Sequence, residues 1–292
     1  MPITPSEIQT LVLKEDDFGH EMRVGKIIRD VPNIRAEHGG TYTDPISGKP
    51  RQFDFRCALL KVSAELHLAV ECKNLNPSAP IVMCGTKRQD NEAFHDLIES
   101  RLNSVSPGKQ KHVTYVDGPS SATFRASRED AFYPPKSFVA KSILRIKPNP
   151  NKSQLATVPF VSDSDADIYD KWSQALSSSV ELAELACERA AHYRVPKFYC
   201  AILPVVVVPD ESLWTVCYDE NGAVLKQPEL VNACELLVGR EITVTRKWMP
   251  HQFTFSHIHF FTLTGFAAFL SCMAVDDVFW NKLFTTRALE IC

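Results

Sequence analysis

The segment from Phe53 to Lys73 constrains the fold of this chain most strongly, because its pattern requires two strands side by side. Two apolar runs with many β-forming residues, 53–60 and 66–72, flank a short polar stretch. This arrangement predicts an antiparallel β-hairpin. The fold must therefore contain a sheet that includes these two strands.

The register of this hairpin brings two acids together. With a short loop that pairs Leu60 with Glu65, the same register places Asp54 opposite Glu71. Opposed residues share one face of a sheet, with Cβ atoms about 4.5 to 5.5 Å apart. Side chains alternate along a strand, so Lys73 is expected on the same face as Glu71. The other face is expected to be apolar, with Phe53, Phe55, Leu66, Leu68, Val70 and Cys72.

Two carboxylates this close repel each other unless a cation compensates them or one pKa is raised. Mg²⁺ compensates such pairs, binding carboxylate oxygens, waters and substrate phosphates. A lysine beside the metal can contact the scissile phosphate or orient a metal-bound water. Asp54, Glu71 and Lys73 are therefore the candidate catalytic residues of a phosphodiester hydrolase that uses Mg²⁺ or Mn²⁺. The alternative is an ion cluster on an exposed sheet face, which would stabilise the fold little.

Asp54, followed after sixteen residues by Glu71-Cys72-Lys73, resembles the motif of the PD-(D/E)XK nuclease superfamily. The resemblance implies an α/β fold of the α+β type with a mixed sheet. Its restriction-endonuclease-like core has the order helix-strand-strand-strand-helix-strand. It also implies that Asp54, Glu71 and the backbone carbonyl of Cys72 bind the metal, and that Lys73 positions the attacking water.

The remaining pattern fits that order over about residues 18–208. We expect a helix over 18–30, a long helix over 165–193 with an apolar stripe, and a buried strand over 198–208. A polar helix is expected over 91–102. These predictions place a nuclease-like core in residues 1–210, with an insertion at about 104–164. Residues 211–292 are expected to supply C-terminal strands and a helix, with Thr264 as its cap, that pack on or extend the same sheet.

Three accessory residues follow from the resemblance. In the superfamily the helix before the hairpin often contributes an acid, which here is Glu21. Some members carry a Lys or Gln on the later helix, which makes Lys171 and Gln174 possible second-layer residues. Glu21 can equally be a solvated helix charge, and ordinary surface positions are the favoured interpretation of Lys171 and Gln174.

The loop before Asp54 carries Lys49, Arg51 and Gln52, which can contact the phosphate backbone of a nucleic acid. A solvated loop without a partner explains them equally well. The formal net charge of the chain, -3, neither indicates nor excludes nucleic-acid binding, because a nuclease needs only a locally basic surface.

The nine cysteines occur singly and predict free thiols in a reducing cytoplasm. No secretion signal is recognised at the N-terminus. The uncharged segment Gln252 to Val275 is interpreted as a buried strand and helix and not as a membrane span. His257 and His259 share one strand face and could bind a metal, but a core role is the favoured interpretation.

The sequence thus predicts a metal-dependent endonuclease that acts on DNA, without a membrane partner. A homodimer is a further hypothesis, because enzymes that cut both strands commonly use two sites, although no residue in the sequence indicates an interface. The alternative is a catalytically silent module of the same fold that binds nucleic acid or protein. A further alternative is a phosphoesterase acting on a small nucleotide.

Overall fold

The computed structural model describes residues 3–15, 17–61, 63–75, 78–101, 120–125, 132–148, 160–163, 165–190, 197–246 and 249–284. In these ranges the protein is a mixed α/β structure with five α-helices, α1 to α5, around one large mixed sheet. The predicted α/β class with a mixed sheet is confirmed. Of the insertion expected at about 104–164, residues 104–119, 126–131, 149–159 and 164 lie outside the described residues.

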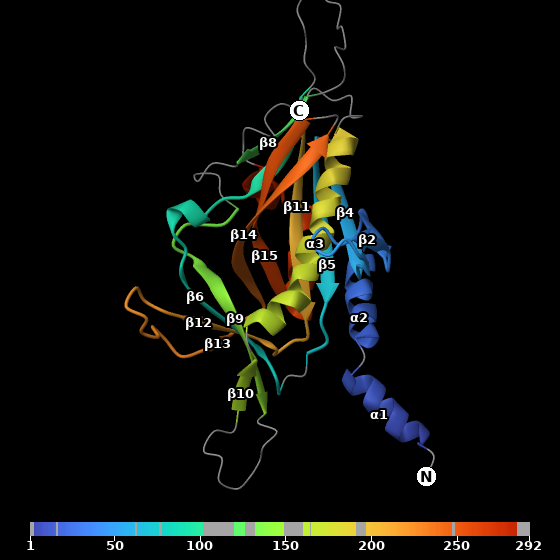
Figure 1. Ribbon diagram of the computed structural model, residues 1–292, viewed down its shortest axis with the longest axis vertical. Coiled ribbons are helices and arrows are strands. Elements are labelled where there is room, and N and C mark those ends of the chain that lie inside the picture. The colour runs from blue at the N-terminus through green and yellow to red at the C-terminus, as the bar shows by residue number, and fades with distance from the viewer. Residues whose placement is uncertain are drawn as a thin grey trace, which may run out of the picture.

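Four strands form the part of the sheet that carries the hairpin (Figure 1). β1 (Ile34–His38) pairs antiparallel with β4 (Phe55–Lys61), and β4 pairs antiparallel with β5 (Ala64–Cys72). β11 (Lys197–Val208) lies parallel to β5 on its other side. The carboxyl ends of β5 and β11 therefore meet at one edge of the sheet.

The hairpin has the predicted register. Leu60 pairs with Glu65, and the last pair of the ladder, Phe55 with Val70, leaves Asp54 one residue beyond it. The turn is tighter than expected, because Lys61 and Ala64 already pair.

One side chain of the hairpin lies on the unexpected face. The Arg56 guanidinium carbon lies 4.2 Å from the centre of the Phe53 ring, and Arg56 bonds to Ser178 on the opposite side of the sheet from Phe55. The prediction that Phe53 shares the face of Phe55 is therefore wrong. The chain bends at Asp54, so period-two alternation does not extend back through it.

The remaining strands extend this sheet beyond β11. β15 lies parallel to β11, followed by β14, β9, β6, β12 and β13, while β7, β8 and β10 pair at its sides. A separate two-stranded sheet contains β2 and β3. The bounds are β2 Thr41–Thr43, β3 Pro50–Gln52, β6 Ile81–Lys87, β7 Asp96–Arg101, β8 Ser120–Arg125, β9 Phe138–Pro148, β10 Phe160–Asp163, β12 Leu213–Cys217, β13 Glu229–Leu230, β14 Ala233–Arg246 and β15 Met249–Thr262.

Because β9 from the expected insertion and β14 and β15 from the C-terminal third all belong to this sheet, it joins segments far apart in the chain. The proposed division at residue 210 stays a prediction.

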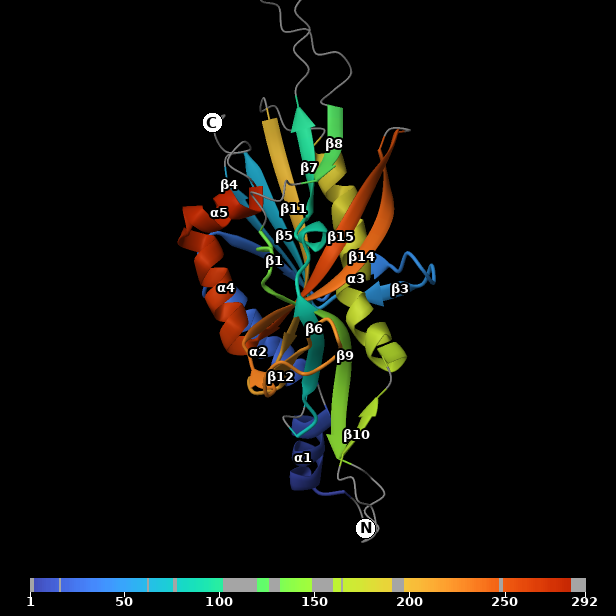
Figure 2. The same ribbon diagram turned by 90° about the vertical axis from the view of Figure 1, so that its left-hand side faces the viewer.

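Helices cover both faces of the sheet (Figure 2). α3 (Asp165–Ala190) packs on one face, where its apolar stripe joins a core with Ala69 and Ile202. α2 (Phe18–Arg29), α4 (Leu263–Val275) and α5 (Asp277–Phe284) cover the other face. α1 (Pro5–Glu15) precedes α2. Successive residues of β5 therefore point alternately into two different cores.

Two sequence expectations about helices are corrected. The polar helix over 91–102 is a short 3₁₀ turn, Asp90–Glu92, followed by strand β7. Leu97 and Ile98 are buried in the cores on opposite faces of the sheet, which neighbouring residues achieve in a strand and not in a helix.

The C-terminal helix is the other correction. It is broken at Asp276 into α4 and α5, and its cap is Thr262, whose Oγ1 accepts a hydrogen bond from the Gly265 N–H at 3.1 Å. The predicted strand and helix over Gln252 to Val275 are confirmed as β15 and α4. Among the described residues, no single helix is long and apolar enough to cross a bilayer. α4 and α5 together have the required length and composition, but the two helices are bent by 91° where they meet.

Candidate functional site

The candidate site lies where β5 and β11 end. The Lys73 N–H donates to the Val207 carbonyl at 2.9 Å, which continues the parallel ladder by one bond. Glu71 and Lys73 are two residues apart and therefore share one face, the face covered by α3. The carboxyl end of β5, held by its bond to β11, thus presents both side chains toward α3.

Asp54 is held at this edge by the backbone of its partner strand. Its Oδ2 accepts a hydrogen bond from the Cys72 N–H at 2.6 Å. Burial raises the pKa of the Asp54 carboxyl, although this hydrogen bond and the charge of Lys73 act in the opposite direction. The bond fixes the carboxylate beside Glu71, as the hairpin register predicted.

Glu71, Lys73 and Gln174 form a chain of polar contacts. Lys73 Nζ lies 2.5 Å from Glu71 Oε1 and 3.2 Å from Gln174 Oε1. Gln174 comes from α3, so the helix and the strand hold the ammonium between them. The side chains of Glu71 and Lys73 are only 6% and 17% exposed.

Burial and the ion pair act in opposite directions on these two residues. Burial and the charges of Asp54 and Glu21 raise the pKa of Glu71, the charge and hydrogen bond of Lys73 lower it, and the resulting pKa is about 7. Burial lowers the pKa of Lys73, but the charge and hydrogen bond of Glu71 outweigh burial, so the net shift is upward. The lysine is therefore an ammonium ion at neutral pH.

Glu21 reaches the site from the first turn of α2. Burial raises the pKa of its carboxyl, and the charge of Asp54 acts in the same direction. Its Oε2 lies 3.5 Å from His38 Nε2 on β1. The helix start is held by the Asn74 N–H, which donates to Asp17 Oδ1 at 2.9 Å. The structure thus brings Glu21 into electrostatic reach of the two predicted acids.

Two other expected residues stay predictions. The side chain of Lys171 lies outside the described part of the chain. The Cys72 carbonyl stays a predicted ligand, while the Cys72 side chain points into the opposite core.

The predicted phosphate-contacting residues lie on an adjacent hairpin. Lys49, Arg51 and Gln52 are exposed around β3, which pairs with β2. Arg51 Nε lies 2.6 Å from Asp44 Oδ2, so its charge is partly balanced. Tyr42 on β2 donates from its hydroxyl to the Gln174 carbonyl at 3.4 Å, which places this hairpin next to the site.

Sequence reasoning gave no role to His38, Tyr42 or Asp17. The pairing of His38 with Phe55 places His38 beside Asp54. That pairing depends on which strand lies next to β4, and the strand order cannot be predicted from the local sequence of β1.

The donor set fits a hard divalent cation. Asp54, Glu71 and Glu21 supply carboxylate oxygens, against a single lysine charge. Burial raises all three carboxyl pKa values, and repulsion adds to it, from Asp17 on Asp54 and from Asp54 on both Glu21 and Glu71. A cation among the carboxylates would relieve both effects. Oxygen donors with excess negative charge are the ligands that Mg²⁺ and Mn²⁺ prefer.

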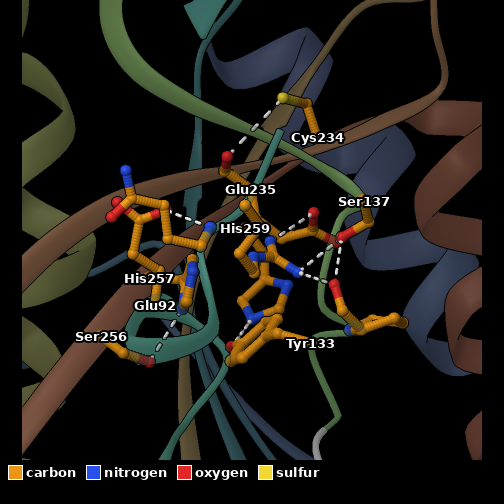
Figure 3. Close-up of polar contacts among 11 residues, drawn as sticks. Glu92, Tyr133, Ser137, Cys234, Glu235, Ser256, His257 and His259 are labelled. Atoms are coloured by element: carbon orange, nitrogen blue, oxygen red, sulfur yellow. Dashed lines mark hydrogen bonds and ion pairs between the residues drawn. The ribbon is translucent and has the colours of Figure 1, made fainter. Parts of the chain in front are cut away.

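His257 and His259 lie in a second buried polar cluster (Figure 3). His259 Nε2 lies 2.6 Å from the Tyr133 hydroxyl, and His257 Nδ1 lies 2.9 Å from Ser256 Oγ. The Arg88 guanidinium lies over the Tyr133 ring at 5.1 Å. The two histidines are core residues, which agrees with the favoured interpretation of the sequence.

No family model, no curated protein and no solved structure matches this chain. The functional proposal therefore rests on the residues and geometry of the site.

Proposed function

We propose that this protein is a metal-dependent endonuclease that hydrolyses phosphodiester bonds of DNA, with a restriction-endonuclease-like core. The observation that carries the proposal is the buried chain of contacts from Glu71 through Lys73 to Gln174. Asp54 joins it by accepting a hydrogen bond from the backbone N–H of Cys72, the residue between Glu71 and Lys73. A solvated ion cluster would not bury Glu71 to 6% exposure at the end of a central strand.

The order of elements supports the same class. α2, β1, β4, β5, α3 and β11 follow one another in the order helix-strand-strand-strand-helix-strand once the separate β2–β3 hairpin and the elements from β6 to β10 are set aside. Within this set the strands are antiparallel, antiparallel and then parallel. Ligand sites of α/β sheets lie beyond the carboxyl ends of strands, which is where Glu71 and Lys73 are found.

Asp54 and Glu71 would hold the Mg²⁺ or Mn²⁺, with Glu21 and the Cys72 carbonyl as further oxygen donors. When bound, such an ion lowers the pKa of a water and neutralises charge on the phosphate.

The side chains of the protein would hold the DNA in place and direct the Lys73 ammonium toward its phosphate. Lys73 stays protonated and can donate to a phosphate oxygen, while Glu71 and Gln174 fix its direction from two sides. The exposed Lys49, Arg51 and Gln52 would contact the DNA backbone beside the site.

The test is cleavage of supercoiled plasmid, single-stranded DNA and branched DNA in Mg²⁺ or Mn²⁺. Asp54→Asn, Glu71→Gln and Lys73→Met should each reduce cleavage to background, because each removes a ligand or the phosphate contact. Far-ultraviolet circular dichroism should stay unchanged, because Asn, Gln and Met fill nearly the same volume.

Glu220→Gln is the matched control, an exposed acid in the turn that follows β12. It should cleave at the wild-type rate. Equal cleavage by the wild type and the three site variants would reject the proposal. DNA binding without turnover would instead favour a silent binding module, and turnover of mononucleotides alone would favour a small-nucleotide phosphoesterase. A homodimer stays a prediction, and it is measured by sedimentation of the wild type with and without DNA.

A further inference from the structure

A second group of metal-ligating side chains lies at the beginning of β5. Glu65 and His67 are two residues apart on this strand, and Cys200 lies beside Glu65 on the parallel strand β11. The ligand atoms of the three residues all lie within 4.8 Å of one another. They share the face of the sheet that α3 covers, because Cys200 belongs to the core on that side.

This group is buried as deeply as the apolar residues around it. Glu65, His67 and Cys200 are 2%, 4% and 0% exposed. Within the group, His67 Nε2 lies 2.8 Å from Glu65 Oε2. A carboxylate buried this deeply requires charge compensation, which a neutral thiol does not provide. An imidazole partner or a cation can provide it.

The group is separate from the proposed nuclease site. The same face of β5 carries Glu65, His67, Ala69 and Glu71 in succession, followed by Lys73. Glu65 and Glu71 are six residues apart, which is about 20 Å along a strand. Ala69, between the two polar groups, packs into the α3 core. One strand face thus carries two distinct polar groups, one at each end.

The donor atoms differ from those of the nuclease site. Imidazole nitrogen, thiolate sulfur and carboxylate oxygen together are typical of Zn²⁺, whereas Mg²⁺ disfavours sulfur. Tetrahedral zinc with bonds of about 2.1 Å holds its nitrogen and oxygen ligands about 3.4 Å apart. The His67 and Glu65 atoms would therefore separate by roughly half an ångström to admit the ion, which is a rotamer adjustment.

α3 brings a second sulfur, and a fourth candidate ligand, to the same core. Cys187 is 2% exposed and lies in the core cluster that contains Cys200, but its sulfur is not among the ligand atoms that lie within 4.8 Å of one another, so it would have to move closer to complete the site. A tetrahedral zinc site needs four ligands, and structural sites are closed by protein side chains.

We propose that Glu65, His67 and Cys200 bind a structural zinc ion, with Cys187 as the fourth ligand. The ion would fasten the C-terminal half of α3 to β5 and β11. This inference is independent of the nuclease proposal, because it concerns different residues and a different metal.

The test uses the purified full chain, stripped with a chelator under reducing conditions and then titrated with Co²⁺. In the wild type, one Co²⁺ per chain should give the visible bands of tetrahedral cobalt and a sulfur-to-cobalt charge-transfer band in the near ultraviolet; Co²⁺ bound by the carboxylates of the proposed nuclease site has no sulfur ligand and does not add to that band. Zn²⁺ should displace the cobalt and raise Tm, because a ligand that binds only the folded state stabilises it.

Three variants locate the site. Cys200→Ser should weaken Co²⁺ binding by at least about tenfold and reduce the charge-transfer band. Cys272→Ser, an exposed cysteine on α4, should bind as wild type does. Asp54→Asn should also keep the cobalt spectrum, which separates this site from the nuclease site. A stripped wild type that gives no tetrahedral cobalt spectrum and no Tm shift with Zn²⁺ would overturn the proposal and leave a buried Glu65–His67 ion pair. An unchanged spectrum in Cys200→Ser would overturn it as well.

Discussion

At the scale of single residues, Lys73 shows how the fold fixes a flexible side chain. A lysine ammonium on a four-carbon chain has many rotamers, and ordering it is entropically unfavourable. Here Glu71 and Gln174 contact the ammonium from a strand and from a helix, at 2.5 and 3.2 Å. Two partners on different elements restrict its direction more than one partner can.

We expect Gln174→Ala to reduce DNA cleavage by about 10- to 100-fold, the effect typical of losing a residue that orients a site. In this variant Glu71 would still stabilise the charged form of Lys73, but the ammonium would lose its contact with the side chain at position 174. The measurement is the cleavage rate at saturating Mg²⁺, which separates positioning from metal affinity.

The control is Glu188→Gln, an exposed residue further along α3. It should cleave as wild type does. If Gln174→Ala also cleaves at the wild-type rate, Gln174 does not position the lysine.

At the scale of elements, the start of α4 depends on close approach of two backbones. Thr262 caps the helix, and its N–H donates to the Asn232 carbonyl at 3.0 Å. A Cβ built at Gly265 would lie 1.9 Å from that same carbonyl oxygen. Only glycine allows the loop before β14 to touch the first turn of α4.

We expect Gly265→Ala to lower the free energy of unfolding by about 1 to 3 kcal/mol, because the loop or the helix must shift. Gly19 in α2 is the matched case, since a Cβ there meets nothing within 4 Å. Gly19→Ala should raise the free energy of unfolding by about 0.5 to 1 kcal/mol, because alanine has less conformational entropy to lose. Urea denaturation of both variants measures the two values, and a shift of the same sign in both would contradict the packing argument.

At the scale of the whole molecule, the fold buries histidines as neutral groups, and three of them, His95, His257 and His259, have strongly lowered pKa values. Burial lowers the pKa of His257 to about 2 and of His259 to about 3, and the charge of Arg88 acts in the same direction. Burial likewise lowers the pKa of His95 to about 4, opposed by its hydrogen bond to the Leu283 carbonyl and by the charge of Asp96. Below pH 6.5, the ordinary pKa of histidine, the unfolded chain binds protons that the folded protein does not.

Acid is therefore expected to destabilise the fold, by about 1.4 kcal/mol per pH unit for each such histidine below pH 6.5. Glu71 acts in the opposite direction between its ordinary pKa of 4.5 and about 7, because its folded form holds the proton more tightly. The direct test is consequently a comparison of variants. His257→Phe keeps the ring contact with Tyr133, whose centroid lies 3.9 Å away, and removes one titrating group.

The free energy of unfolding of His257→Phe should fall less steeply than that of the wild type between pH 6.5 and pH 5, by about 1.4 kcal/mol per pH unit. Urea titrations at several pH values measure both slopes. Parallel slopes would show that His257 is not held neutral in the folded state.

The sequence alone determined what depends on neighbours along the chain. The register of the β4–β5 hairpin follows from two alternating runs and a short turn, and it placed Asp54 at the end of the strand beside Glu71. The apolar stripe of α3 and the continuous apolar run of β11 likewise predicted a helix over a sheet and a buried strand. Period and run length are local properties, so they can be read without the fold.

Only the tertiary structure decided which distant elements lie together. The polar pattern of 91–102 favoured a helix, but pairing with β11 and β8 makes Asp96–Arg101 a strand. The neighbourhood of Glu65, His67 and Cys200 exists only because β5 and β11 are parallel partners, although more than a hundred residues separate them in the chain. Such contacts arise when the burial of both sheet faces selects one strand order, and no local pattern records that selection.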